Sequence, residues 1–329
     1  MCYAKAMAET YEANRPITKY VHSTSRGHEA IQLATAFQLQ PQDWVSPYYR
    51  DESLLLGLGW QPYELMLQLL TKKDDPFTGG RSYYSHPASK AADKPKIMHQ
   101  SSATGMQAIP ATGLAQGLQY LESIGSPLLH TGANGELPLV ICSLGDASIT
   151  EGEVSEAMQF AVLKQLPIIF LVQDNEWGIS VTAAEGRAMD AYKYAKGFKG
   201  LNRVRVDGTD FFKSYDTMHK VVHRVRTKRE PWLVHARTCL LNHHTSGVRK
   251  ETYRSEEDLK AHACRDPFEL FQKAIASQFS EEALQEIEAA AAKEIAQQFA
   301  DAVAALEPDP ATVSARSVIR LTWRRILTT

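Results

Sequence analysis

Several kinds of sequence signal are scarce or missing in this chain of 329 residues, and each absence excludes a class of protein. The four cysteines form no close pair, which argues against a zinc site and against a disulfide framework. No apolar run approaches the ~20 residues that span a bilayer. The formal net charge is only −2 at pH 7, so no excess of basic residues indicates a nucleic acid or a membrane surface as partner.

The remaining composition is that of a globular protein, with 44% hydrophobic and 22% charged residues. A chain of this length can bury a large core, either as one long α/β domain or as two domains. Segment 1–20 contains acidic residues and no continuous apolar stretch, so it resembles neither a signal peptide nor a clear transit peptide. We therefore expect a cytoplasmic protein.

The most informative stretch runs from Leu139 to Val181 and has the pattern of a β-α-β unit. A short apolar run at 138–144 is followed by a helical pattern and by a second apolar run at 167–172. The helix is predicted to begin at a capping box formed by Thr150 and Glu153, and its apolar residues recur at the spacing of one helix face. The two strands of such a unit are parallel.

Polar residues follow both strands of this unit. Gly145 and Asp146 come after the first strand, and Asn175 comes just after the second. Because parallel strands end at the same edge of a sheet, Asp146 and Asn175 should lie together where open α/β sheets bind ligands. A carboxylate and an amide oxygen, with a backbone carbonyl from the next turn, suit Mg²⁺ or Ca²⁺. Ordinary turns at the strand ends would explain the same residues.

Two other segments carry groups that suit an anionic ligand. Tyr49 and Arg50 follow a short strand, and a guanidinium beside a phenol can hold a phosphate. When this segment is taken alone, a surface arginine paired with Asp51 or Glu52 is the simpler explanation. Segment 242–254 follows a later strand and is polar and basic, which is the composition of a loop able to order over an anion.

Several structural expectations accompany these motifs. Ser25 is expected to cap a helix, with His28 near its first turn as a partly buried structural histidine rather than a ligand. Gly113 and Gly117 predict a helix face that packs closely against a neighbour, and small residues at the start of that helix would equally let a flat ring approach the backbone. Segment 71–96 is rich in glycine, proline and polar residues and is predicted to be a long surface loop.

The alternation of strands and helices continues beyond the central unit and predicts an α/β fold with a mostly parallel sheet flanked by helices. Strands are expected near 203–210 and 231–237, with a basic helix between them. We expect one domain over 1–310 that includes an alanine-rich C-terminal helix at 280–306. The basic tail at 311–329 has no assigned place.

Taken in order, four motifs resemble the α subunit of the E1 component of 2-oxo acid dehydrogenase complexes, which are decarboxylases that depend on thiamine diphosphate (ThDP). The motifs are Tyr49-Arg50, the segment 101–110, Gly145-Asp146 with Asn175, and His243-His244 followed by hydroxyl residues. Each motif is weak alone, but the ordered set between about 25 and 254 is specific. The resemblance implies a ThDP-binding fold that uses ThDP and Mg²⁺ as cofactors.

The resemblance also implies roles for particular residues. Asp146 and Asn175, with the carbonyl of Trp177, would hold Mg²⁺, and His244 would be catalytic, near the thiazolium. Tyr49 and Arg50 would contact the diphosphate, the backbone around Ala103 and Gly105 would meet the aminopyrimidine ring, and the amides of Ala147 and Ser148 would support the phosphates. The complete set implied to bind the cofactor is Tyr49, Arg50, Ala103, Gly105, Gly145, Asp146, Ala147, Ser148, Asn175 and His244.

The sequence departs from the family pattern at three positions. Ala147 stands where many ThDP enzymes have glycine, Leu240 where the family often has an arginine, and Gln173 where branched-chain relatives have a positive residue. The last two departures reduce the positive charge near the diphosphate. Our hypothesis is that Arg249 or Lys250 supplies the missing charge. Thr245 stands where some animal relatives carry a phosphorylated serine, and nothing else in the sequence indicates such regulation here.

The resemblance further implies partners and a reaction. An E1 β subunit would complete the active site in an α₂β₂ heterotetramer, because the sequence shows no second ThDP-type module, and the acyl group would pass to the lipoyl group of an E2 acyltransferase. The His-His-Thr-Ser run at 243–246 favours a branched-chain substrate, 3-methyl-2-oxobutanoate. The alternatives are a pyruvate or acetoin enzyme, a catalytically silent ThDP-fold scaffold, and a nicotinamide-dependent Rossmann enzyme. The last is disfavoured because no G-x-G-x-x-G follows an early strand.

Overall fold

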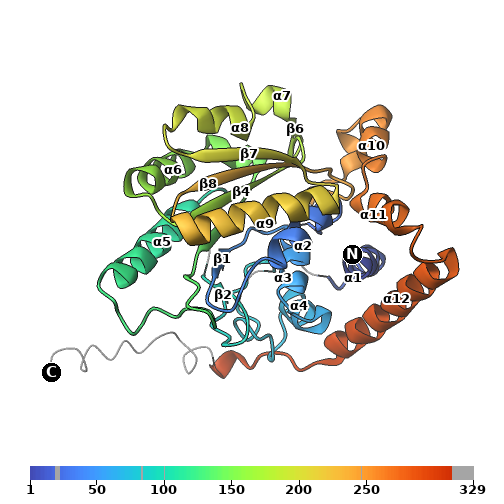
Figure 1. Ribbon diagram of the computed structural model, residues 1–329. Helices are drawn as coiled ribbons and strands as arrows, with labels where there is room; N and C mark the ends of the chain where they lie inside the picture. The colour runs from blue at the N-terminus through green and yellow to red at the C-terminus, as the bar shows by residue number, and fades with distance from the viewer. Residues whose placement is uncertain (19–22, 83, 100, 246, 313–329) are drawn as a thin grey trace.

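A single parallel sheet organises the chain (Figure 1). The computed structural model describes residues 1–18, 23–82, 84–99, 101–245 and 247–312. Within these residues, six strands pair in parallel in the order β2-β1-β3-β4-β8-β7. The strands are β1 (Trp44–Ser46), β2 (Lys96–Ile97), β3 (Val140–Gly145), β4 (Ile168–Asp174), β7 (Asn202–Asp207) and β8 (Trp232–Arg237). The predicted α/β class with a mostly parallel sheet is confirmed.

Helices cover both faces of this sheet and extend the chain beyond it (Figure 1). On one side lie α5 (Ala108–Ser123), α6 (Gly152–Lys164) and α8 (Ala191–Tyr194). The opposite face is covered by α9 (Phe211–Lys228), on which α2 (Glu29–Ala36) and then α3 (Glu52–Gly57) pack. The helices α4 (Pro62–Leu69), α12 (Glu281–Ala304) and α1 (Cys2–Ala13) continue this layer away from the sheet (Figure 1). Smaller elements are α7 (Ala183–Gly186), α10 (Glu256–Ala263), α11 (Pro267–Ile275) and the hairpin of β5 (Trp177–Gly178) and β6 (Val181–Thr182).

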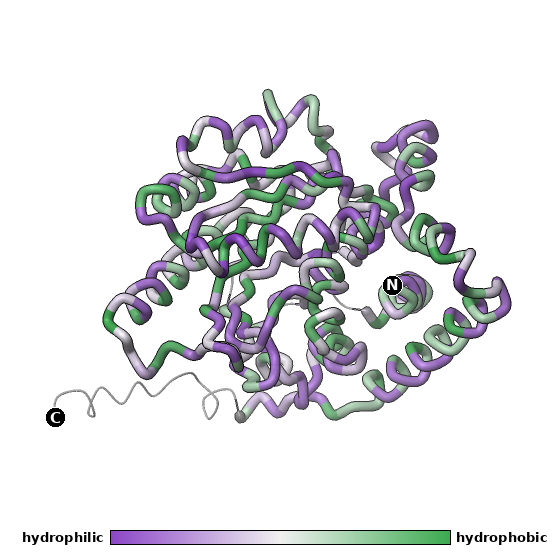
Figure 2. Tube along the Cα trace, in the orientation of Figure 1, coloured by the Kyte–Doolittle hydropathy of each residue, from purple (hydrophilic) through white to green (hydrophobic). Residues whose placement is uncertain are grey.

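The central strands are buried on both faces, which is why they are apolar without interruption (Figure 2). Successive side chains of a strand point to opposite faces of the sheet. In β4, Ile169 and Leu171 therefore join the core beneath α9, while Ile168 and Phe170 join the core beneath α5 and α6. The two cores lie on opposite faces of the same strands, so helices pack against the sheet from both sides and fix the strand ends from which the loops emerge.

The central β-α-β unit is present, but its helix does not begin where the capping box predicts. After β3 the chain forms a 3-10 turn, η1 (Asp146–Thr150), and α6 then starts from Glu151, whose backbone is extended and whose side chain caps nothing. The expected Thr150–Glu153 capping box is therefore wrong. Similarly, α2 begins after His28 and not at Ser25, whose hydroxyl bonds to that of Ser53 instead.

The C-terminal helix packs within the chain. α12 lies inside the predicted range 280–306 and buries Ala291, Ile295 and Phe299 against α1 and α4. The tail predicted at 311–329 lies outside the described residues from 313 onward, and the domain boundary at 310 stays a prediction. In the described part of the chain, no helix is long and apolar enough to cross a membrane.

The prediction of close packing at Gly113 and Gly117 is wrong within this chain. A Cβ atom at either position would meet no atom of the described residues within 4 Å. The opposite face of α5, with Ala111 and Ala115, packs on the sheet and on α6. The two glycines thus lie on an open helix surface, and Gly117 lines a depression there.

Candidate functional site

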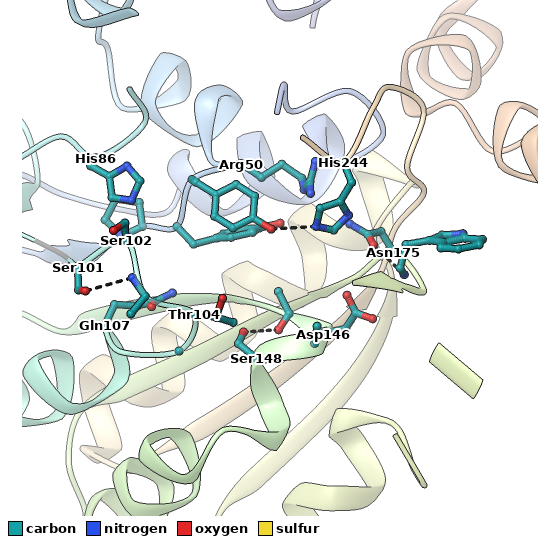
Figure 3. A pocket seen from close by; sticks show the side chains of 18 residues that line it. Arg50, His86, Ser101, Ser102, Thr104, Gln107, Asp146, Ser148, Asn175 and His244 are labelled. Atoms are coloured by element: carbon teal, nitrogen blue, oxygen red, sulfur yellow. Dashed lines mark hydrogen bonds between the residues drawn. The ribbon is translucent and has the colours of Figure 1, made fainter. Parts of the chain in front are cut away.

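A cleft opens at the carboxyl ends of β1, β3 and β4, where the loops after these strands meet the segment before α5 and the loop that carries His244 (Figure 3). Every residue that the sequence implied for the site lines this cleft: Tyr49, Arg50, Ala103, Gly105, Gly145, Asp146, Ala147, Ser148, Asn175, Trp177 and His244. These positions span nearly two hundred residues of sequence. Parallel strand order brings them to one edge, as expected for an open α/β sheet.

The cleft also contains residues that the sequence did not single out. They are Pro47, Tyr48, His86, Ser101, Ser102, Thr104 and Gln107. Four of them lie inside the 101–110 motif, and Pro47 and Tyr48 directly precede Tyr49-Arg50, so the motifs covered or adjoined these positions without assigning them individual roles. His86 is different, because it belongs to the segment predicted as a surface loop and yet is buried, with Nδ1 hydrogen-bonded to the Tyr84 carbonyl at 2.9 Å. No local pattern marks that histidine.

Arg50 is a buried cation whose hydrogen-bonding capacity is incompletely used. It is 1% exposed, its Nη1 donates to Ser23 Oγ, and its guanidinium lies 5.4 Å from the Tyr49 ring centre. Nε and Nη2 are buried and make no hydrogen bond to any described residue. Burial acts to lower the pKa of Arg50, but Tyr48 and Tyr49 outweigh it, so the pKa is raised and the group stays charged. A buried charge with unused donors suits an anionic ligand.

Tyr49 contacts both Arg50 and His244. Its hydroxyl lies 3.1 Å from His244 Nε2, and this contact orients the imidazole toward the cleft (Figure 3). His244 itself is buried, so the ring is held in place rather than free in solvent. His244, the predicted catalytic histidine, and Tyr49, a predicted diphosphate ligand, are therefore hydrogen-bonded to each other.

The oxygen ligands predicted for a metal line the same cleft, and Asn175 lies beside His244 (Figure 3). Asp146 and Asn175 are both buried. Asn175 Oδ1 accepts from the Trp177 N–H at 3.1 Å, and its amide nitrogen lies 3.1 Å from His28 Nε2. Burial and the charge of Arg50 hold the pKa of His28 well below its usual range, so this ring is neutral and can accept from the amide. The histidine expected to be only structural thus orients a predicted metal ligand.

Asp146 belongs to a pair of buried carboxylates. Burial and the charge of Asp174 raise the pKa of Asp146 to about 8, although Arg187 opposes this shift. Burial would also raise the pKa of Asp174, but hydrogen bonds from His235 and Arg187 outweigh it and hold that pKa below its usual value. Asp174 therefore carries the charge near neutral pH, and a cation bound at Asp146 would have to displace a proton.

The three departures from the family pattern have structural consequences. Gln173 is buried, and its amide donates to Asp51 Oδ1 at 2.7 Å and to Ser143 Oγ at 2.9 Å, so this position adds no charge to the cleft. Leu240 is buried as well. Ala147 does not have a positive φ, and its methyl group lies against Gly178, so a side chain is accommodated there.

Arg249 and Lys250, proposed from the sequence to replace the missing charge, do not line the cleft. The Arg249 guanidinium pairs with Glu12 at 2.6 Å, and the Lys250 ammonium donates to the Leu241 carbonyl. The structure gives this compensation no support. Among the described residues that line the cleft, Arg50 is the only arginine or lysine.

The cleft fits a diphosphate held with a divalent cation. The unused donors of Arg50 would satisfy phosphate oxygens, and Asp146 and Asn175 offer the oxygen ligands that Mg²⁺ prefers. No cluster of three His, Cys, Asp or Glu side chains that could hold a metal exists among the described residues. A cation here would depend on one carboxylate, an amide, a carbonyl and the ligand itself, as is usual for Mg²⁺ bound with phosphates.

Comparison with known proteins gives a consistent family. Residues 3–311 match the family model described as "Dehydrogenase E1 component". The chain is 28% identical over 284 residues to "3-methyl-2-oxobutanoate dehydrogenase subunit alpha" of Mycobacterium tuberculosis, and the aligned region covers 86% of this chain and 70% of that protein. It is 28% identical to "2-oxoisovalerate dehydrogenase subunit alpha" of Bacillus subtilis, over 75% of this chain and 70% of that protein. It is 30% identical to "Pyruvate dehydrogenase E1 component subunit alpha" of Porphyra purpurea, over 76% of this chain and 69% of that protein.

Proposed function

Because the chain belongs to the dehydrogenase E1 component family, we propose that it is the α subunit of an enzyme that oxidatively decarboxylates a 2-oxo acid with ThDP and Mg²⁺. The observation that carries this proposal is Arg50, a buried cation with two unused donors that lines the same cleft as Asp146 and Asn175. The family match also removes the alternative of a nicotinamide-dependent Rossmann enzyme.

Each cleft residue then has a task that its surroundings support. Arg50 and Tyr49 bind the diphosphate, and Asp146, Asn175 and the Trp177 carbonyl hold Mg²⁺. The amides of Ala147 and Ser148, at the turn after Gly145, face the phosphates. ThDP, when bound, supplies the electron sink for decarboxylation.

The remaining residues orient the reacting end. Gly105 has φ of +80°, and a Cβ there would lie 3.1 Å from Glu151 and Val154, so glycine keeps the Ala103–Gly105 backbone close to the position proposed for the aminopyrimidine ring. His244, held by Tyr49, is the residue we propose to handle the acyl group during its transfer. Its hydrogen bond sets the ring orientation before substrate arrives.

We propose that a β subunit completes this site in an α₂β₂ assembly and that the acyl group passes to a lipoyl group on E2. The named relatives are themselves α subunits, which supports a divided enzyme. The open surface of α5 at Gly113 and Gly117 offers a face on which a second helix could pack closely. A cytoplasmic location, expected from the sequence, belongs to the same proposal.

The proposed substrate is 3-methyl-2-oxobutanoate. The names of relatives include both branched-chain and pyruvate enzymes, so the preference rests on the His243-His244 run. Part of the acyl pocket would come from the β subunit.

The test is to purify the full chain with the partner that it retains and to measure ThDP- and Mg²⁺-dependent reduction of an artificial electron acceptor. Turnover of 3-methyl-2-oxobutanoate faster than pyruvate supports the whole proposal, and the reverse order replaces the substrate only. Asp146→Asn should abolish turnover, whereas Asp190→Asn, which breaks an ion pair of 2.6 Å with Arg205 outside the cleft, should not. A co-purifying partner without turnover of any 2-oxo acid would favour the silent scaffold.

A further inference from the structure

Arg187 bridges two buried carboxylates at the edge of the sheet. Its Nη2 donates to both oxygens of Asp174, at 2.7 and 2.8 Å. Its Nη1 lies 3.0 Å from Asp146 Oδ2, which is an ion-pair contact not aligned as a hydrogen bond. The Arg187 side chain is 8% exposed, so solvent screens these charges little. This arginine follows α7 and was not marked by any sequence motif.

The far end of the bridge is fixed by a third strand. His235 of β8 places Nε2 2.7 Å from Asp174 Oδ2, and the Glu176 N–H donates to Oδ1 at 3.1 Å. Asp174 ends β4, Asp146 follows β3, and β3, β4 and β8 are neighbours in the sheet. Arg187 is therefore anchored at Asp174 and reaches toward Asp146 from a fixed point.

Arg187 approaches Asp146 from behind the cleft. It does not line the cleft itself, but it lines a separate depression with Asp146, Ala147 and the residues of the β5–β6 hairpin. The Asp146 carboxylate thus lies between this depression and the cleft. Its Oδ2 atom contacts Arg187, while the same carboxylate also lines the cleft.

We propose that Arg187 is a positioning residue that holds Asp146 in the orientation required to bind the divalent cation. Metal-binding carboxylates are commonly oriented by hydrogen-bonding or charged partners on the side away from the metal. Once a cation has displaced the Asp146 proton, the two carboxylates and the one guanidinium leave one net negative charge beside it. Because Asp174 holds Nη2 through both oxygens, Arg187 cannot swing into the cleft and replace the metal.

The inference rests on the proposed function in one respect, that a divalent cation binds at Asp146 with ThDP. The test therefore measures metal binding and not turnover. Mn²⁺ is titrated into the full chain, with its retained partner, at saturating ThDP, and free Mn²⁺ is followed by electron paramagnetic resonance. Thermal unfolding of the metal-free protein is recorded for every variant.

Arg187→Met should weaken Mn²⁺ binding about 10- to 100-fold, the usual effect of removing a group that orients a metal ligand. Arg187→Lys keeps the charge and should recover part of this loss. Arg205→Met is the matched control, since Arg205 also pairs with an aspartate on this side of the sheet but touches neither carboxylate of the pair, and it should bind Mn²⁺ like the wild type.

Wild-type affinity for Mn²⁺ in Arg187→Met would show that the arginine only stabilises the fold, and tighter binding would show that it competes with the metal. Either result overturns the inference. If Arg187→Met does not fold, Asp174→Asn removes the charge that anchors the arginine while keeping its shape, and unchanged Mn²⁺ affinity in that variant overturns the inference equally. A wild-type protein that binds no Mn²⁺ with ThDP would instead refute the proposed function.

Discussion

Replacing Arg50 by methionine should have opposite effects on stability and on cofactor binding. In the ligand-free protein the two unused donors of this buried cation are unfavourable. An unsatisfied buried donor costs about 1–3 kcal/mol, and a charged one more. Arg50→Met keeps an apolar side chain of similar length, so the free energy of unfolding of the ligand-free protein should rise by about 1–3 kcal/mol, less the lost bond to Ser23.

Binding should change in the other direction. Hydrogen bonds to charged groups contribute about 1.5–3 kcal/mol each, so losing two of them should weaken ThDP binding by about 3–6 kcal/mol, or about 10²- to 10⁴-fold. In urea unfolding, ThDP at 100 times its wild-type dissociation constant should stabilise the wild type by about 2.7 kcal/mol and leave the variant nearly unchanged.

A fully paired arginine provides the control for this reasoning. Arg226 is also buried, but it binds Asp43 through two contacts of 2.8 and 2.7 Å and donates to the Leu137 carbonyl at 2.7 Å. Arg226→Met should therefore destabilise the protein by about 3–5 kcal/mol, because Asp43 is left as an unpaired buried charge. If Arg50→Met lowers the ligand-free stability as Arg226→Met does, Arg50 is a structural arginine and the argument for an anion site fails.

Three further predictions follow from single residues. The pKa of Asp146 is raised to about 8 by burial, so Mg²⁺ affinity should fall up to about tenfold for each pH unit below 8, and a flat metal titration from pH 6 to 8 would contradict this. Burial raises the pKa of Glu52 to about 7, so the native state binds this proton more tightly than the unfolded state and the free energy of unfolding should fall as pH rises through that value. The loss should reach about 3 kcal/mol at pH 8 in urea unfolding, and Glu52→Gln should remove it. An unchanged pH profile in Glu52→Gln would refute this assignment. Gly27 has φ of +96°, and a Cβ there would lie 2.0 Å from the Cys239 carbonyl oxygen, so a thermal melt of Gly27→Ala should show no folded baseline. Gly117→Ala, on the open face of α5, should be neutral or raise the free energy of unfolding by up to about 1 kcal/mol.

Local patterns were least reliable at the starts of helices. A capping box needs the right residue types, but it forms only where the backbone enters the helix at that position. Here a 3-10 turn occupies Asp146–Thr150 and moves the start of α6 to Gly152. Ser25 likewise bonds to Ser53 rather than to its own helix, because a buried hydroxyl partner from α3 is available. Contacts between distant segments decided both cases.

The periodicity of apolar residues was sufficient to predict the parallel sheet and the edge at which Asp146 and Asn175 lie. Two uninterrupted apolar strands joined by a helix indicate a parallel pair, and parallel strands end together, so Asp146 and Asn175 were expected to meet. Arg50 was added to this site only by the resemblance to the family. The side chains that contact these residues could be identified only from the three-dimensional structure: Arg187 contacts Asp146, and His28 contacts Asn175. The physical reason is that strand periodicity is a local property of the chain, whereas ion pairs and hydrogen bonds between elements depend on the register and separation of segments far apart in sequence.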